Sequence, residues 1–154
     1  MNTAYIEKFI AAGKTVFESF GMNVETGDIS YKTSPYHADN LVIVIGLTGD
    51  LHGQAIISTQ HKTACSISSV MMGGDIASFN EEVKSAIAEL SNMITGNAIT
   101  LLSQADIFLD MTPPSVLTGE NMSISAISKS LIIPFIIDNG IMELSLCAKE
   151  LATD

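Results

Sequence analysis

The stretch Asn80-Glu-Glu-Val-Lys-Ser-Ala-Ile-Ala-Glu-Leu-Ser-Asn-Met-Ile-Thr-Gly-Asn-Ala-Ile-Thr-Leu-Leu102 decides the fold, because one predicted helix carries two separate patterns. The first pattern is apolar and recurs at intervals of three and four residues, the spacing that stacks side chains on one helical face. Asn80 can cap the helix, and Glu81 and Glu82 place negative charge in its first turn, where unpaired N–H groups favour it. We expect the buried face to comprise Val83, Ile87, Leu90, Ile94, Ala98 and Leu101.

The second pattern has the same spacing and comprises Ser85, Glu89, Asn92 and Gly96. At about 100° per residue its mean direction lies roughly 160° from the apolar stripe, so we expect this face to look outward. Glu89 and Asn92 are neighbours at i and i+3, which sets an acceptor beside a carboxamide. Gly96 costs about 1 kcal/mol relative to alanine inside a helix, so we expect something to approach the backbone there. Spacing alone is typical of a solvated surface.

Two sequence motifs resemble a known family. The string Ser85-x-x-x-Glu89-x-x-Asn92-Met93-Ile94-x-Gly96-Asn97 resembles the signature of the CheC/CheX/FliY family of chemotaxis phosphatases. A second string resembles the segment that follows this helix in CheX-like members, and it reads Asp110-x-Thr112-Pro113-Pro114-x-Val116-x-x-Gly119. The strand-rich remainder also fits, so the resemblance covers most of the chain.

The resemblance implies a fold, an activity and residue roles. The fold is α+β and CheC-like, with a largely antiparallel sheet covered by long helices. The activity is hydrolysis of the aspartyl phosphate of a CheY-like response regulator receiver domain. Asn92 would position the attacking water, Glu89 would pair with the receiver's lysine, and Ser85 and Gly96 would supply rim and clearance. The receiver would bring the Mg²⁺, and the chain would have no cofactor of its own.

Two other classes of function stay open at this point. One is a non-catalytic module that binds or scaffolds a receiver domain in a two-component pathway. Loss of Glu89 or Asn92 would mark that class, and both are present. The other is a small-molecule sensor built on the methionine-rich interior, although ordinary core methionines explain those residues better.

The number of motifs indicates the subfamily. A single Glu-x-x-Asn motif, as in this chain, is typical of CheX-like members, whereas CheC members carry two.

Composition limits the partners and the compartment. The chain of 154 residues is 47% hydrophobic, which suits one domain spanning 1–154. Seventeen acidic and seven basic residues give a net charge of −10, which opposes binding to nucleic acid or anionic membranes. The longest apolar runs fall far short of the ~18 residues that span a bilayer. The first twenty residues do not resemble a signal peptide, so we expect a cytoplasmic protein.

The inventory of reactive groups disfavours a metal site or covalent catalysis. The three histidines lack metal-ligand spacing, and no Gly-x-Ser-x-Gly elbow occurs. Cys65 and Cys147 are too few and too far apart for a disulfide framework, so we expect reduced core residues. The lysines are scattered, so a phosphatase built from this chain must borrow its cationic groups from its partner.

Periodicity and turn residues predict the remaining elements. A helix covers 5–20, an extended segment covers 24–33, and Thr48-Gly49-Asp50 turns a hairpin within 39–59. A short helix starts at Gln60 and stops at Gly73-Gly74. A strand at 106–111 precedes a rigid Pro113-Pro114 loop, and extended runs follow at 122–128, 131–137 and 141–148. Asp138-Asn139-Gly140 joins the last two, and the two hairpins, 41–57 and 131–147, hint at an internal duplication.

The C-terminal third predicts a two-fold homodimer formed through β-strands. Pro134 cannot donate to a ladder, so its strand has at least one side free or irregular there. The run 122–128 lacks charge, which leaves it poorly protected against pairing with another chain. Dimerisation by joining sheets is also implied by the family resemblance. The dimer should leave Glu89 and Asn92 free.

Overall fold

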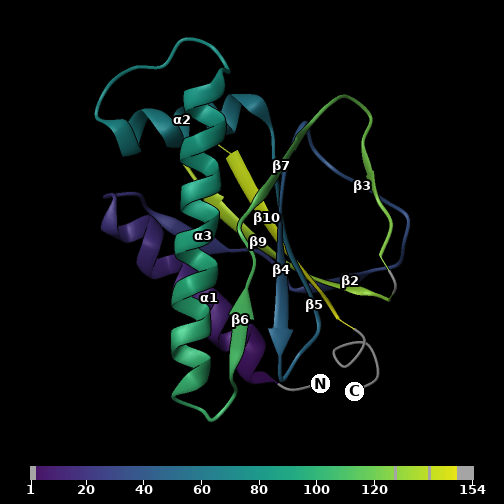
Figure 1. Ribbon diagram of the computed structural model, residues 1–154. Coiled ribbons are helices and arrows are strands. Elements are labelled where there is room, and N and C mark those ends of the chain that lie inside the picture. Colours follow the sequence, from purple (N-terminus) through teal and green to yellow (C-terminus); the bar gives the residue numbers. More distant parts are fainter. Residues whose placement is uncertain (1–2, 127, 139, 149–154) are drawn as a thin grey trace.

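The computed structural model describes residues 3–126, 128–138 and 140–148, and it has an antiparallel sheet with helices on one face (Figure 1). The main sheet has the order β1-β9-β10-β5-β4-β6, with β2 also beside β9 and β7 also beside β4. The predicted α+β class is therefore confirmed. The elements are α1 (Thr3–Ser19), β1 (Val24–Thr26), β2 (Ser30–Lys32), β3 (Tyr36–His37), β4 (Leu41–Gly49), β5 (Gly53–Thr59), α2 (His61–Met72), α3 (Glu81–Ser103), β6 (Leu109–Met111), β7 (Ser115–Thr118), β8 (Ser123–Ile124), β9 (Ser130–Ile137) and β10 (Gly140–Ala148).

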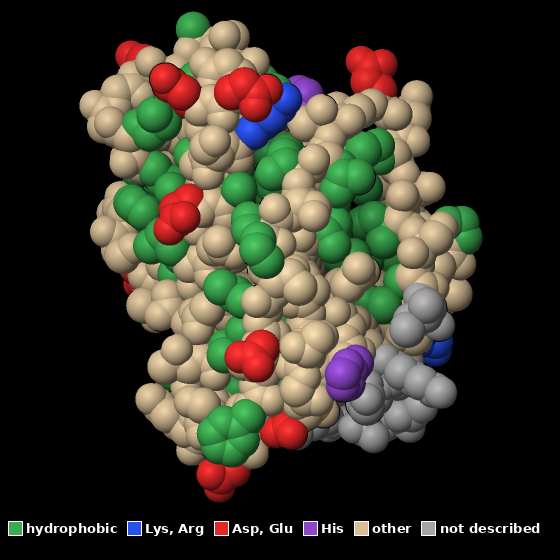
Figure 2. Space-filling model, in the orientation of Figure 1, with side chains coloured by type: hydrophobic (Ala, Val, Ile, Leu, Met, Phe, Trp, Pro, Cys, Tyr) green, Lys and Arg blue, Asp and Glu red, His purple; other side chains and the backbone are tan. Residues whose placement is uncertain are grey.

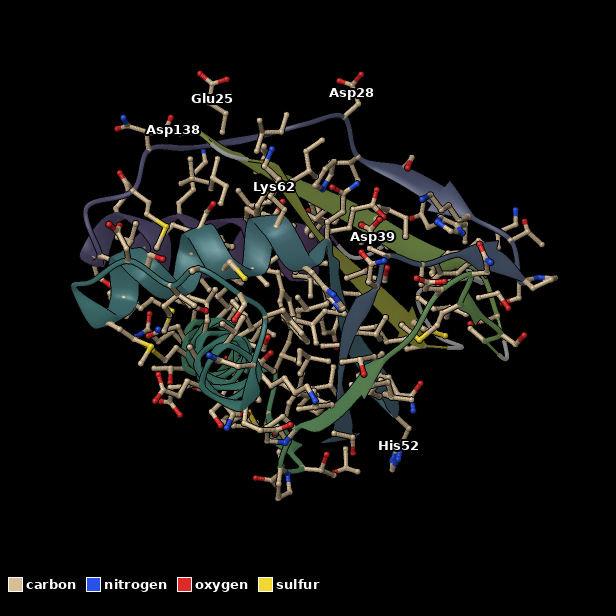
Figure 3. The ribbon with its side chains drawn as sticks, turned by 90° about the horizontal axis from the view of Figure 1, so that it is seen from above. Glu25, Asp28, Asp39, His52, Lys62 and Asp138 are labelled. Carbon is tan, nitrogen blue, oxygen red and sulfur yellow. The ribbon has the colours of Figure 1, made fainter. Side chains whose placement is uncertain are left out.

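The two faces of the sheet are covered differently. Seen from above, the three helices lie together on one side of the strands (Figure 3). α3 packs against both α1 and α2 and also against β4, so it lies at the centre of the main core. On the other face, β3 and β8 pair into a small second sheet. This cover buries a minor core of Ala38, Val42 and Ile56.

Helix α3 forms as predicted, with a wider buried sector than the apolar stripe. The Asn80 side chain accepts a hydrogen bond from the Val83 N–H at 3.0 Å, which confirms the cap. Five of the six stripe residues are buried, but Leu101 is only half-buried and Leu102 is fully buried in its place. Because α1, α2 and β4 all pack against α3, they bury a wider sector of the helix than the apolar stripe alone covers. The polar residues Ser91 and Thr95 are buried as well.

Both predicted hairpins are present and lie side by side. β4 pairs with β5, β9 pairs with β10, and β5 and β10 then pair with each other in the middle of the sheet. This arrangement is the one that a duplicated half-unit would give, and the duplication itself stays a prediction. The left-handed Gly73 at φ 72° ends α2 as expected. Asn139, part of the predicted C-terminal turn, lies outside the described residues.

Pro134 marks an irregular position, but its strand is not an exposed edge. Its carbonyl accepts a hydrogen bond from the Gly27 N–H at 2.9 Å, in the break between β1 and β2. The backbone N and O of one strand residue point to the same side of the strand. The N–H that Pro134 lacks would therefore also face the break between β1 and β2, where no strand residue needs it as a donor. The predicted irregularity is confirmed, whereas the expected free edge is wrong because β1 and β2 cover that side of β9.

Several predicted boundaries in the second half of the chain are wrong. The strand expected at 106–111 begins only at Leu109, because Asp106 has a left-handed backbone at φ 61°. Within the described part of the run 122–128, which leaves out Ile127, a strand forms at Ser123–Ile124, and the Ala126 N–H bonds to the Ser34 side chain instead of a ladder. The strand β7, directly after the two prolines, was not predicted. Proline breaks a ladder only at its own position, so a strand can resume after it.

The Gly13→Ala substitution tests the contact between α1 and the sheet. A Cβ at Gly13 would overlap the ring of Phe135, which is fully buried and lies 5.7 Å from the Phe17 ring, centroid to centroid. We expect the free energy of unfolding to fall by about 1–3 kcal/mol, despite alanine's better helix propensity. Denaturant unfolding measures it. Gly74→Ala, where nothing lies within 4 Å of a Cβ, should change it by less than about 0.5 kcal/mol. Equal effects at both positions would contradict the packing argument.

Candidate functional site

The structure brings the four predicted site residues together along one side of α3. Ser85 and Glu89 are exposed, as expected for an outward face. Asn92 and Gly96 are half-buried, which corrects that expectation for the second half of the stripe. β6 lies beside α3 (Figure 1). Its last residue brings the Met111 methyl group towards Gly96, which accounts for the half-burial at that position. The site is therefore exposed at its Glu89 end and recessed at its Asn92 end.

Asn92 holds a buried hydrogen-bond acceptor that has no partner within the described residues. Its Oδ1 is inaccessible and unpaired, and so is the Thr95 Oγ1 three residues later. By contrast, the hydroxyls of Ser91 and Thr100 donate to carbonyls one turn back in the helix, at 2.7 and 3.1 Å. An unsatisfied buried polar group costs about 1–3 kcal/mol, and such groups in native proteins often mark a catalytic role or a water position. The Asn92 amide is thus uncommitted to the fold.

Glu89 carries a charge that no described lysine neutralises. The ion pairs formed in the described part of the chain are Lys32 with Glu143 at 3.3 Å and Lys84 with Glu81 at 2.8 Å. Glu89 takes part in neither and is exposed. An exposed carboxylate without an internal partner can bind a cationic group of another molecule with no ion pair to break. Its position one turn before Asn92 would hold that group close to the amide.

Gly96 is not required by packing within this chain. A Cβ at this position would lie 3.7 Å from the Met111 Cε, which is ordinary van der Waals contact. The group that approaches the helix backbone at Gly96 is therefore the Met111 methyl group. It lies far enough away that an alanine side chain would fit at this position. Gly96 adds no side chain to the surface one turn after Asn92, and its role as clearance for a receiver stays a prediction.

The second motif of the sequence lies beside the first in space. β6 and β7 both contact α3 and both pair with β4, so 109–118 forms the edge of the sheet beside the helix. Thr112 fixes this passage, because its N–H donates to the Gly46 carbonyl at 3.0 Å while its Oγ1 accepts from the Gly46 N–H at 2.8 Å. The sequence did not predict this contact. The sequence analysis also did not identify Thr95. The one feature that could have done so is a hydroxyl group on the buried side of the predicted helix.

The other reactive groups are dispersed. Within the described residues, no group of three or more His, Cys, Asp or Glu side chains is placed to hold a metal ion. Lys62 and His52 lie far apart, and the labelled carboxylates of Glu25, Asp28 and Asp138 project along the rim of the molecule (Figure 3). Burial raises the pKa of the Cys65 thiol, which keeps it neutral and weakly nucleophilic. Cys65 and Cys147 are both free, as expected.

Across the described ranges, none of the helices is both long enough and apolar enough to cross a bilayer.

This chain is similar to known proteins in both sequence and structure. The family model described as "Chemotaxis phosphatase CheX" matches residues 41–136. The CheY-P phosphatase CheX of Thermotoga maritima is 34% identical over 122 residues, which are 79% of each protein. The crystal structure of the chemotaxis protein CheX from Desulfovibrio desulfuricans has a TM-score of 0.85 at 26% identity, covering 94% of this chain and 99% of that one. CheX in the Borrelia burgdorferi CheX–CheY–BeF3–Mg²⁺ complex has a TM-score of 0.81 at 30% identity, covering 94% and 97%.

The Gly96→Ala substitution separates packing from surface clearance. Because the Met111 methyl group leaves room for a Cβ, alanine should raise the free energy of unfolding by up to about 1 kcal/mol through helix propensity. Thermal or denaturant unfolding measures the change. Asn97→Ala, an exposed change on the next residue, is the propensity control. A clear loss of stability in Gly96→Ala alone would mean that the backbone at Gly96 is closed by packing within the chain.

Proposed function

This chain belongs to the CheX family of chemotaxis phosphatases, and we propose that it hydrolyses the aspartyl phosphate of a CheY-like receiver domain. The observation that carries the proposal is the side of α3 on which an unpaired carboxylate, Glu89, precedes an uncommitted amide, Asn92. Two relatives support the substrate, because one is named a CheY-P phosphatase and another was solved together with CheY. We further propose that the whole chain acts as one domain in the cytoplasm.

Asn92 is proposed to align the attacking water. A carboxamide can both donate to a water molecule and accept from it, which fixes the direction of the oxygen lone pair. The terminal torsion of asparagine is broad, so either end of the amide can face the water. The water oxygen attacks phosphorus in line, the bond to the aspartyl oxygen breaks, and the products are inorganic phosphate and the free carboxylate. The unpaired Oδ1 means that no existing hydrogen bond is lost in this step.

Glu89 is proposed to dock the receiver by pairing with a lysine at its active site. The carboxylate is exposed and has no ion pair among the described residues, so its charge is available to a partner. Charge pairing of this kind fixes the register in which two surfaces meet. Ser85 would line the rim of the contact and Gly96 would give the receiver room to reach Asn92.

The receiver is also proposed to bring the Mg²⁺ that the reaction needs. The Borrelia complex contains Mg²⁺ and BeF3 together with CheX and CheY. When bound, the ion would offset the negative charge on the phosphoryl oxygens. This chain contributes none of the clustered carboxylates that hold such an ion within its described part.

The Asn92→Ala substitution tests the catalytic assignment. We expect kcat for dephosphorylation to fall by about 100-fold or more, with little change in the KM for the receiver. Stability should not fall and should rise by up to about 1–3 kcal/mol, since the substitution removes an unpaired buried acceptor and introduces a better helix former. Loss of radiolabelled phosphate from a panel of purified receivers measures the rate. Full activity in a folded Asn92→Ala protein would remove Asn92 from the mechanism.

Two companion variants sharpen this test. Asn97→Ala removes an exposed amide from the same helix and should leave both kinetic constants unchanged. Glu89→Gln should chiefly raise the KM, because its proposed role is docking. A parent protein that binds a receiver without accelerating its dephosphorylation would favour the scaffold alternative instead.

The two-fold dimer is proposed to form through β7. The run 122–128, the edge expected from the sequence, is engaged with β3 at Ser123–Ile124. β7 pairs with β4 on one side, is uncharged, and has all four residues exposed. The opposite end of the sheet carries Glu25 in β1 and Lys32 in β2, and charges on an edge strand oppose pairing. The β7 edge is thus the less protected one.

The Leu117→Lys substitution tests this dimer. Leu117 is 46% exposed on β7, and a lysine there should convert the dimer into a monomer in light scattering at micromolar concentration. Ile136→Lys, at a position 40% exposed on β9, is the matched control and should leave the dimer intact. A parent that is already monomeric would refute the dimer, and dissociation by Ile136→Lys alone would move the interface to the other end of the sheet.

A further inference from the structure

A methionine-floored groove lies between the last turn of α2 and the first half of α3. Its volume is about 530 Å³. Met71, Met72 and Ala86 supply apolar surface, and Met72 is 50% exposed. The space-filling view shows hydrophobic side chains beside carboxylates near the upper end of α3 (Figure 2). The polar residues that line the groove are Glu81, Glu82, Ser85 and Glu89.

The groove is formed before any partner arrives, because the connection between its two helices is fixed. The Ile76 N–H donates to the Ser69 hydroxyl at 3.0 Å, which ties the connection to α2. Phe79 stacks on His61 with 3.7 Å between ring centroids and 5° between ring planes. Two such contacts on a short connection hold α2 and α3 at a set separation. A preformed groove loses less conformational freedom on binding than a flexible one.

We propose that this groove docks an apolar side chain of the receiver domain that is flanked by a lysine or arginine. The inference rests on the proposed function, since the occupant belongs to the receiver whose phosphate meets Asn92. It assigns a second contact to that receiver, apart from the Glu89 and Asn92 pair. Methionine side chains suit the task because they are flexible and polarisable and adapt to the shape of the group they receive.

The position of the groove places it within reach of a docked receiver. Glu89 lines the groove and also lies one turn before Asn92, so the groove adjoins the candidate site. Ser85, also on its wall, is about 10 Å from Asn92 along the axis at 1.5 Å per residue. A standard protein interface covers about 800 Å² per partner, a patch about 30 Å across. A receiver centred on Asn92 therefore covers the groove.

The charges around the groove define the chemistry of its occupant. Among the described residues, Glu82 has no ion pair, whereas Glu81 holds Lys84 at 2.8 Å. Glu89 is also unpaired, but its charge is assigned to the lysine at the receiver's active site. The unpaired Glu82 carboxylate beside an apolar floor attracts a basic side chain adjacent to an apolar one and repels an acidic surface. The net charge of −10 extends this preference to the whole molecule. An acidic or purely apolar occupant does not match this rim.

The first test removes the apolar floor. Met72→Ser should raise the KM for the phosphorylated receiver by about fivefold or more and leave kcat unchanged, because apolar burial is lost away from the reacting atoms. Val70→Ser is the matched control, since Val70 is 46% exposed on the same helix and lines a different hollow with Gly21 and Met22. Val70→Ser should leave both constants unchanged. Equal KM values for the parent and Met72→Ser would overturn the proposal.

The second test addresses the rim. Glu82→Gln should raise the KM by about two- to threefold at low salt and flatten its dependence on ionic strength. Glu120→Gln removes an exposed carboxylate outside the groove and is the control. An unchanged salt dependence in Glu82→Gln would contradict the basic character of the occupant.

Binding measurements separate this inference from the proposed function. Calorimetry with a CheY-like receiver carrying beryllofluoride and Mg²⁺ reports docking without hydrolysis. If the parent binds but does not hydrolyse, the phosphatase proposal fails, and weaker binding by Met72→Ser but not Val70→Ser still supports the groove. If Met72→Ser binds as tightly as the parent, the groove proposal fails whatever the activity. A parent that does not bind any receiver overturns both.

Discussion

The burial of the apolar stripe of α3 is the constraint on which the rest of the structure depends. Because a helix places successive residues 100° apart, burying Val83, Leu90 and Ile94 leaves only one rotation of α3 about its axis. That rotation presents Glu89 to solvent and leaves Asn92 half-buried. A slip by one residue would expose the stripe and hide the polar side chains. The geometry of the candidate site is therefore fixed by hydrophobic packing on the other side of the same helix.

The candidate site contains polar groups that the fold does not satisfy. The Asn92 Oδ1 and the Thr95 Oγ1 are buried without partners in the described part of the chain, at adjacent positions of one helix. Each such group lowers stability by about 1–3 kcal/mol unless water or a ligand pairs with it. The large core around Phe9, Phe17 and Phe135 can tolerate that loss. Unsatisfied groups at a site of chemistry are consistent with an amide reserved for an external molecule.

Sequence patterns predicted local elements well and lateral contacts poorly. The period of α3, its Asn80 cap and the two hairpins depend on neighbouring residues, and each is present. The half-burial of Asn92 and Gly96 was not predicted, because periodicity does not encode contacts with distant segments such as the one between Gly96 and Met111 of β6. β7 was missed because two prolines precede it, and the bond of Thr112 to Gly46 that carries the chain past them is a tertiary contact. The roles of Glu89 and Asn92 came from family resemblance, because their spacing alone fits an ordinary surface.

The pairing of β5 with β10 has a consequence for how the chain folds. It joins strands on the order of 90 residues apart in sequence, so closing that loop carries an entropic barrier of about 4 kcal/mol before any contact forms. The segment from β4 to β7, which includes α3, is contiguous and can assemble through much shorter loops. Long-range strand pairing is slow compared with local contacts. Until the C-terminal hairpin is synthesised and pairs, the inner edge of β5 has no strand partner, and an unpaired strand edge favours aggregation.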